Sequence, residues 1–255
     1  MGFEQGAESY DRFMGRFSRP LARELVERIG VREGQRALDV GCGSGAVTER
    51  LVDVLGAGAV CAIDPTPPFV AAVRERLAGV DVRLGGAEEL PYDDDAFDLV
   101  VANLVVPFMT DPAAGLGEMR RVTRPGGLVV VTVWDHVNDR GAASMFWRAV
   151  REAVPEREVD GESVLLAQIE RRLEGLCAEA GLRDLATSEI TVTLTFDAFE
   201  QWWEPFELSV GPAGDYYAGL DDETRAAVRA RAAQLFGAPP FPVPATARVV
   251  VGTAP

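Results

Sequence analysis

The sequence predicts an α/β fold built around a mostly parallel sheet, and two observations lead to this prediction. Short apolar segments alternate along the chain with segments whose apolar residues recur at helical spacing. A cluster of glycines at 41–45 directly follows the first apolar segment, as happens where a buried strand turns tightly into a helix. Strands that alternate with helices form parallel sheets through crossovers, and ligands of such sheets lie beyond the C-terminal ends of the strands.

The expected elements follow one another without a low-complexity linker, so we expect a single domain over 1–255. Apolar runs and alternation predict strands at 37–40, 59–63, 80–84, 97–102, 128–134, 186–196 and 245–252. Helical periodicity predicts a helix over 9–30 with a break near Pro20, and a second helix that begins directly after the glycine cluster. It predicts further helices over 69–77, 113–122, 142–154, 165–180 and 221–236.

The composition argues against several classes of function. A net charge of −15 without a basic run repels phosphate, so we expect neither nucleic acid nor an anionic membrane as a partner. Cys42, Cys61 and Cys177 lack paired spacing and the chain has one histidine, so we expect no disulfide framework and no metal site. The N-terminus lacks a signal-peptide pattern and no apolar run approaches the ~20 residues of a membrane span, which predicts a cytoplasmic location.

The glycine cluster is the strongest functional motif. Gly41, Gly43 and Gly45 alternate at the end of a buried strand, where only glycine lets the backbone pass close to a ligand. This spacing differs from the dinucleotide pattern and disfavours a nicotinamide enzyme. Asp64 ends the next strand, where its carboxylate can accept hydrogen bonds from both hydroxyls of a ribose. The alternatives are a tight turn at the glycines and an acid at a helix N-terminus at Asp64.

These residues resemble the class I S-adenosylmethionine-dependent methyltransferases. Residues 37–45 are similar to the family's donor loop, Asp64 to its ribose-binding acid, and 88–92, 97–100 and 112–127 to its later segments. Residues 10–16, 202–206 and 211–214 resemble a bacterial branch related to the ubiquinone and menaquinone methyltransferases. The resemblance implies a Rossmann-like, seven-stranded, mostly parallel sheet with helices on both faces and an antiparallel last strand. It also implies N-terminal helices over 1–30 that close over the donor, and a helical lid insertion at 197–243.

The resemblance implies S-adenosyl-L-methionine as the cofactor, with S-adenosyl-L-homocysteine as its product. The glycine loop and the helix N-terminus favour the donor carboxylate, and Asp39 attracts its ammonium. The family often has Asp at position 86, where this chain has Gly86, so Glu88 or the backbone of Ala87 is expected to meet the adenine. The expected donor contacts are Tyr10, Met14, Arg16, Asp39, Gly41, Cys42, Gly43, Gly45, Asp64, Pro65, Thr66, Gly86, Ala87, Glu88, Asn103 and Leu104.

Methyl transfer depends chiefly on positioning, and a base is needed only when the acceptor must lose a proton. His136, just past the fifth strand, is the candidate base, and the alternative is a loop histidine without a role. Two adjacent tryptophans in a helix are not expected to point into the same core, so one should face a pocket or an interface. The alternative is that the lid packs against the sheet. The expected acceptor contacts are Phe108, Trp134, Trp202, Trp203, Phe206, Tyr216 and Tyr217.

The sequence therefore predicts methyl transfer to the oxygen, carbon or nitrogen of a small, fairly apolar molecule in secondary metabolism. The chain is expected to be a monomer or a homodimer. A rival hypothesis keeps the donor without transferring its methyl group, as in a cyclase, an isomerase or a non-catalytic partner. The third hypothesis is a nicotinamide oxidoreductase, which the glycine spacing disfavours.

Overall fold

The structure is a computed structural model that describes residues 14–155, 161–209 and 211–255. Its centre is a seven-stranded sheet in the order β3-β2-β1-β4-β5-β7-β6. The strands are β1 (Ala37–Val40), β2 (Val60–Asp64), β3 (Asp81–Leu84), β4 (Phe97–Asn103), β5 (Thr123–Trp134), β6 (Arg183–Phe196) and β7 (Phe241–Thr253). β7 is antiparallel to both of its neighbours, whereas β1 to β5 pair in parallel. The predicted fold, with its antiparallel last strand, is confirmed.

Helices surround the sheet, and short 3₁₀ turns at Ala57–Ala59 and Val106–Phe108 join some of the elements. Helix α2 runs through Pro20 without the predicted break. The helices are α2 (Arg16–Ile29), α3 (Ala46–Leu55), α4 (Pro67–Arg76), α5 (Pro112–Val122), α6 (Ser144–Ala153), α7 (Gly161–Glu179), α8 (Phe199–Glu207), α9 (Gly211–Ala218) and α10 (Asp222–Leu235).

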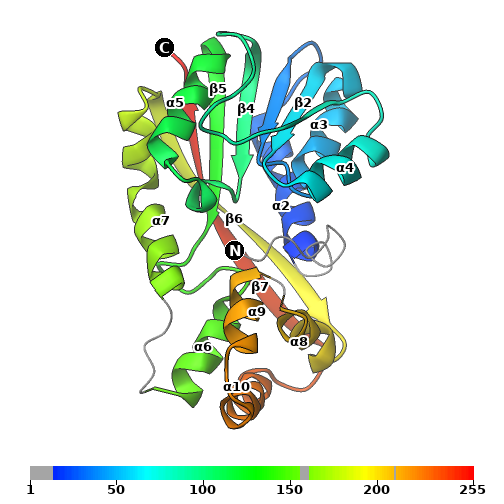
Figure 1. The fold of residues 1–255 in the computed structure, drawn as a ribbon, viewed down its shortest axis with the longest axis vertical. Coiled ribbons are helices and arrows are strands. Elements are labelled where there is room, and N and C mark those ends of the chain that lie inside the picture. The colour runs from blue at the N-terminus through cyan, green and yellow to red at the C-terminus, as the bar shows by residue number, and fades with distance from the viewer. Residues whose placement is uncertain (1–13, 156–160, 210) are drawn as a thin grey trace.

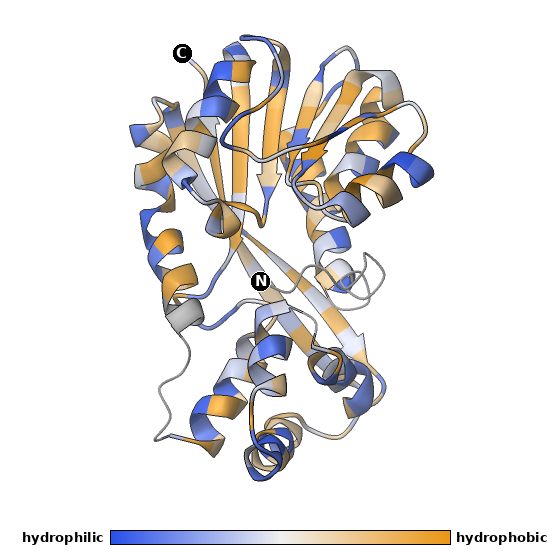
Figure 2. Cartoon of the chain, in the orientation of Figure 1, coloured by the Kyte–Doolittle hydropathy of each residue, from blue (hydrophilic) through white to orange (hydrophobic). Residues whose placement is uncertain are grey.

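Alternate residues of the central strands pack into two separate hydrophobic cores. Leu99 and Val101 of β4 pack in the core that contains α2 and α3. Val100 and Ala102 lie in the core that contains α5 and α7. This division follows from the two-residue period of a strand, which sends successive side chains to opposite faces. Because both faces of the central strands are covered, β1, β2 and β4 are mostly apolar, as Figure 2 shows.

β6 and β7 extend beyond the rest of the sheet and carry a helical cap. The ladder between β5 and β7 ends at Trp134 and Ala247, whereas the ladder between β6 and β7 continues to Phe196 and Phe241. Helices α6, α8, α9 and α10 gather around this projecting arm (Figure 1). We call these four helices the cap. Residues 241–243, which we expected in the lid, belong instead to β7.

The cap has an aromatic core of its own. Phe146 from α6 stacks on Phe206 from α8, with ring centroids 4.6 Å apart. Trp202 and Trp203 are both fully buried, at 1% and 0% exposure, so the expectation that one of them faces a pocket is wrong. Both can be buried because α8 has neighbours on two sides. Trp202 packs on Phe236, and Trp203 packs on Tyr217 and Phe146.

No helix among the described residues is both long and apolar enough to cross a lipid bilayer.

Candidate active site

The loop between β1 and α3 depends on three glycines with left-handed backbone. Gly41, Gly43 and Gly45 have φ of 68°, 51° and 81°, a region that side chains with a Cβ rarely adopt. The amides of Gly41 and Cys42 donate to the carbonyl of Ile63 in β2, which ties the loop to the neighbouring strand. The loop is therefore held by its backbone while its outer surface stays open.

Asp64 lies at the end of β2 and already accepts two backbone hydrogen bonds. The Gly43 amide donates to Oδ2 and the Thr66 amide to Oδ1, each at 2.8 Å. Burial raises the pKa of this carboxyl group, and the hydrogen bonds from the Gly43 amide and from the amide and side chain of Thr66 oppose the rise. The carboxylate is therefore held in a fixed orientation at the cavity edge, which suits recognition of a vicinal diol.

Asp39 is a second buried carboxyl group on the neighbouring strand. It is 1% exposed, and the Thr48 hydroxyl donates to its Oδ2 at 2.6 Å. Burial raises its pKa to about 7, although the hydrogen bonds from Thr48 oppose that rise. A buried carboxylate gains from a cation placed beside it, because the cation compensates for lost solvation.

Two adjacent cavities, which share lining residues, lie at the C-terminal edge of the parallel strands. The larger has a volume of about 410 Å³, within the usual range for a site that binds a small molecule or cofactor. The smaller, of about 40 Å³, reaches Asp39 and Ser18 under α2. We call them the large lobe and the small lobe. Residues that line both lobes are Gly41, Gly43, Asn103 and Leu104.

The far wall of the large lobe is held by Glu88. Its Oε1 accepts hydrogen bonds from the amides of Thr110, at 2.7 Å, and Asp111, at 3.3 Å. An ideal Cβ built on Gly86 would lie 2.8 Å from Glu88 Oε2, so this carboxylate fills the space beside the missing side chain. The wall thus offers one carboxylate oxygen, Oε2, that accepts no hydrogen bond from the described residues.

The donor contacts expected from the sequence fall into three groups. Met14, half-buried, packs against the core on the α2 side of the sheet. Gly45 lies behind the loop, where a Cβ would approach Arg76 and Val73. Tyr10 lies outside the described residues. Those that line a lobe are Asp39, Gly41, Cys42, Gly43, Asp64, Pro65, Thr66, Gly86, Ala87, Glu88, Asn103 and Leu104.

Arg16 is directed toward the cap, which differs from its expected place at the donor. Its guanidinium donates to the carbonyl of Gln201 in α8 at 3.0 Å and lies 6.0 Å from the centre of the Phe196 ring. Arg16 joins α2 to the cap, whereas Ser18 on the same helix lines the small lobe. α2 therefore connects the cavity to the cap.

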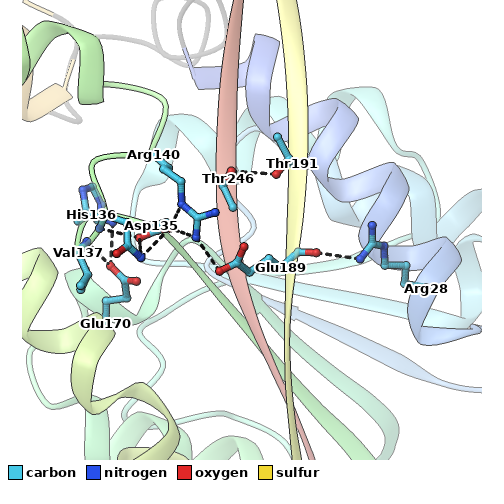
Figure 3. Close-up of polar contacts among 10 residues, drawn as sticks. Arg28, Asp135, His136, Val137, Arg140, Glu170, Glu189, Thr191 and Thr246 are labelled. Carbon is cyan, nitrogen blue, oxygen red and sulfur yellow. Dashed lines mark hydrogen bonds and ion pairs between the residues drawn. The ribbon is translucent and has the colours of Figure 1, made fainter.

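His136 sits where the chain leaves β5, apart from both lobes. Its backbone amide donates to the Glu170 carboxylate at 2.8 Å, and Val137 donates to the same oxygen at 2.9 Å (Figure 3). Burial lowers the pKa of the ring to about 4, despite the nearby Asp135 and Asp139. An imidazole with this pKa is a weak base near neutral pH. His136 is not among the residues that line either lobe.

The expected acceptor residues are also mostly elsewhere. Phe108 lines the large lobe and is 38% exposed. Trp134 is 6% exposed and packs edge-on against Phe17 of α2. Tyr216 packs on Phe146 and Trp147 within the cap. Trp202, Trp203, Phe206 and Tyr217 form the cap core. The structure therefore does not bring this group together around a cavity.

Several lining residues were not predicted. Met109 and Thr110 follow the end of β4, and the rule that ligands lie beyond strand ends points to this segment. Ser18 and Phe69 reach the lobes from helices, and their sequence neighbourhood carries no motif. Other lining residues outside the prediction are Ser44, Ala46, Val47 and Gly85.

Comparisons with known proteins agree with this geometry. A family model described as a methyltransferase domain matches residues 38–131. A demethylmenaquinone methyltransferase of a Mycobacterium species is 34% identical over 134 residues, covering 52% of this chain and 56% of that protein. An uncharacterised 37.1 kDa protein in a transposon of Streptomyces fradiae is 31% identical over 167 residues, 62% of this chain and 46% of that protein. The matches span about half the length of these curated relatives.

A solved structure extends the likeness to the whole fold. It is a methyltransferase from Thermotoga maritima described as a possible histamine N-methyltransferase, with a TM-score of 0.56 and 20% identity. The similarity covers 99% of this chain and 98% of that one. At this identity the comparison shows the fold alone. Together, the matched family model and the curated relatives show a methyltransferase domain over residues 38–131, and the sheet order and the glycine loop agree with it.

Proposed function

We propose that the protein transfers the methyl group of S-adenosyl-L-methionine to a small, fairly apolar acceptor, as in secondary metabolism. The observation that carries this proposal is the preorganised Asp64 carboxylate at the edge of a cavity of about 410 Å³. When the ribose of the methyl donor is bound at Asp64, its adenine lies toward Glu88. Its methionine part then lies toward the small lobe and Asp39. The N-terminus of α3 and the loop amides favour the donor carboxylate.

A small acceptor is supported by charge and by the relatives. The net charge of −15 disfavours nucleic acid, because the surface repels phosphate. The matched Mycobacterium protein is named for demethylmenaquinone, a small molecule. Helix α2 lines the small lobe through Ser18 and reaches the cap through Arg16. We therefore propose that the acceptor approaches between α2 and the ends of β4 and β5, with the cap behind it.

Calorimetry of S-adenosyl-L-homocysteine binding tests the donor site. Asp64→Ala should lose about 1.5–3 kcal/mol of binding free energy for each ribose hydroxyl, because charge-assisted bonds disappear. Asp53→Ala is the matched control, since Asp53 is exposed on α3 and pairs with Arg50 outside the cavities. Equal affinities in wild type and Asp64→Ala would contradict the assignment. Donor binding without S-adenosyl-L-homocysteine formation across a broad panel of small acceptors would favour the rival, a protein that keeps the donor without transferring methyl.

A further inference from the structure

A hydrogen-bond chain at the ends of β4 and β5 fixes the orientation of the Asn103 amide. The Leu104 amide is shared between two acceptors on Thr132, the backbone carbonyl and Oγ1, each at 3.0 Å. Thr132 Oγ1 lies 2.7 Å from Asn103 Oδ1, a usual length for an O–H···O bond. Leu104 has a left-handed φ of 66°, a strained conformation for a residue with a Cβ, so this junction is held tightly.

The hydrogen bonds around Thr132 determine which end of the Asn103 side-chain amide faces the cavities. The Leu104 amide can only donate, so it occupies one lone pair of Thr132 Oγ1. Thr132 is 0% exposed, and its own hydroxyl proton needs an acceptor, which is Asn103 Oδ1. The amide carbonyl is thereby directed at Thr132. The Nδ2 group, with two N–H donors, has no partner among the described residues and belongs to a side chain that lines both lobes.

The position of Asn103 relative to the reacting centre follows from the proposed function. With the ribose on Asp64 and the donor ammonium near Asp39, the sulfonium lies where the two lobes meet. The residues common to both lobes are Gly41, Gly43, Asn103 and Leu104. Of these, Asn103 alone carries a polar side chain. A donor N–H gains nothing from a sulfonium cation, so its useful partner is an oxygen of the incoming acceptor.

The carboxylates that line the lobes are hydrogen-bonded to partners other than Asn103. Asp39 bonds to Thr48, Asp64 to two backbone amides, and Glu88 to Thr110 and Asp111. Burial raises the pKa of the Cys42 thiol far above its ordinary range. No histidine or tyrosine is among the described residues that line the lobes. These residues supply a hydrogen-bond donor at the junction and no base beside it.

We propose that Asn103 Nδ2 binds the oxygen anion of the acceptor, which is an enolate or a phenolate rather than an amine. The acceptor loses its proton to solvent before transfer. An electron pair of the acceptor, on its oxygen or on the carbon conjugated with it, then forms the bond to the methyl carbon. The carbon–sulfur bond breaks, and its electrons remain on sulfur as a neutral thioether. Asn103 acts here as a specificity-determining residue, and Thr132 positions it.

The two N–H groups of Asn103 Nδ2 favour an anionic acceptor over a neutral amine. A neutral amine presents N–H groups of its own to this donor. An oxygen anion accepts from it, because charge-assisted bonds are stronger than neutral ones.

Absorbance and calorimetric titrations of the S-adenosyl-L-homocysteine complex test the proposal. The probes are three anions of different size: 4-nitrophenolate, the enolate of acetylacetone, and ionised 2-hydroxy-1,4-naphthoquinone. The uncharged amine 4-nitroaniline is the matched control. At least one anion should bind wild type tighter than the amine, and Asn103→Leu should weaken that anion about 10–100-fold while leaving the amine unchanged. Asn103→Asp should weaken the binding of that anion further, because the aspartate and the anion both carry a negative charge. The pKa of bound 4-nitrophenol should fall in wild type and recover in Asn103→Leu.

Thr132 provides the positioning test. Thr132→Val removes the hydroxyl that orients the amide and should reduce the preference for anions, whereas Thr132→Ser should restore it. Thermal unfolding confirms that each variant is folded. If wild type prefers none of the three anions, or Asn103→Leu leaves the preference intact, the proposal is overturned. The affinity for S-adenosyl-L-homocysteine, measured on the same preparations, reports the proposed function separately, since a wild-type protein that does not bind it refutes the donor site itself.

Discussion

The carboxylate of Glu88 occupies the space beside Gly86, where an ideal Cβ would lie 2.8 Å from Glu88 Oε2. The two positions are therefore coupled, since a side chain at 86 displaces the acid at 88. Glu88 also holds the Thr110 and Asp111 amides, so its displacement affects the wall of the large lobe.

This coupling predicts a reciprocal result for two variants. Gly86→Asp places a second carboxylate beside Glu88, and like charges at this distance repel, so we expect the affinity for S-adenosyl-L-homocysteine to fall. Adding Glu88→Ala to Gly86→Asp relieves the clash and leaves one carboxylate at the wall, so the double variant should bind more tightly than Gly86→Asp. Calorimetry of the two variants and of Glu88→Ala measures this. Additive losses would show that the positions are independent.

The glycine loop predicts two different defects from two similar changes. A Cβ on Gly41 would lie 2.5 Å from Val105 Cγ2, so Gly41→Ala should lower the unfolding temperature. A Cβ on Gly43 meets no atom within 4 Å, although its φ of 51° is also left-handed. Gly43→Val should therefore cost less stability but abolish donor binding, because its side chain projects into both lobes. Unfolding scans and calorimetry together check the contrast, and normal donor binding by Gly43→Val would contradict it.

Asp39 predicts how stability and donor affinity change with pH. Its pKa is raised from 3.8 to about 7, so the contribution of the protonated acid is full below about pH 4 and is lost as the pH rises through 7. Asp39→Asn should thus be more stabilising, relative to wild type, at pH 8 than at pH 5. Donor affinity should show the opposite trend in wild type, rising from pH 6 to 8 as the carboxylate ionises. In Asp39→Asn the affinity should be weaker and independent of pH in this range. Thermal scans with and without S-adenosyl-L-homocysteine test both.

The two tryptophans of α8 predict a defect in the cap. Because Trp202 and Trp203 are fully buried, replacing either with Ala should cost about 3–5 kcal/mol of unfolding free energy. Trp203→Phe should cost less, since it keeps most of the packing and loses the hydrogen bond from Nε1 to Glu207. Denaturant unfolding followed by tryptophan fluorescence and circular dichroism measures these changes. Wild-type stability in both Ala variants would contradict the packing described for the cap.

We expect replacement of His136 to change the stability of the fold at acidic pH and to leave catalysis unaffected. Its pKa is lowered from 6.5 to about 4, so its contribution to stability is full above about pH 6.5 and is lost as the pH falls toward 4. His136→Gln should therefore lose less stability than wild type across this range. Rate profiles with an identified acceptor should show no limb near pH 6.5 that depends on His136. A limb that disappears in His136→Gln would restore the histidine as a base.

Local patterns in the sequence predicted the seven strands and the helices that flank them, because alternating apolar segments and glycine-rich turns are local. They did not predict α8 and α9 as separate helices. The same patterns predicted a ligand site at the glycine loop and Asp64, since both lie directly at strand ends, where parallel sheets gather their ligands. That rule, extended a few residues past β4, would have found Met109 and Thr110.

The tertiary structure decided what depends on packing between distant segments. An exposed helix buries only one face, so the tandem tryptophans suggested a pocket, whereas α8 is enclosed between α10 and the pair α6 and α9. Position along the chain placed His136 on the ligand side, but the turn after Trp134 directs its backbone to Glu170 on α7. The orientation of the Asn103 amide depends on Thr132, a residue 29 positions away that only the pairing of β4 with β5 brings within 2.7 Å. Local sequence specifies secondary structure and strand-end motifs, whereas burial, pKa and hydrogen-bond direction depend on contacts that only the folded chain creates.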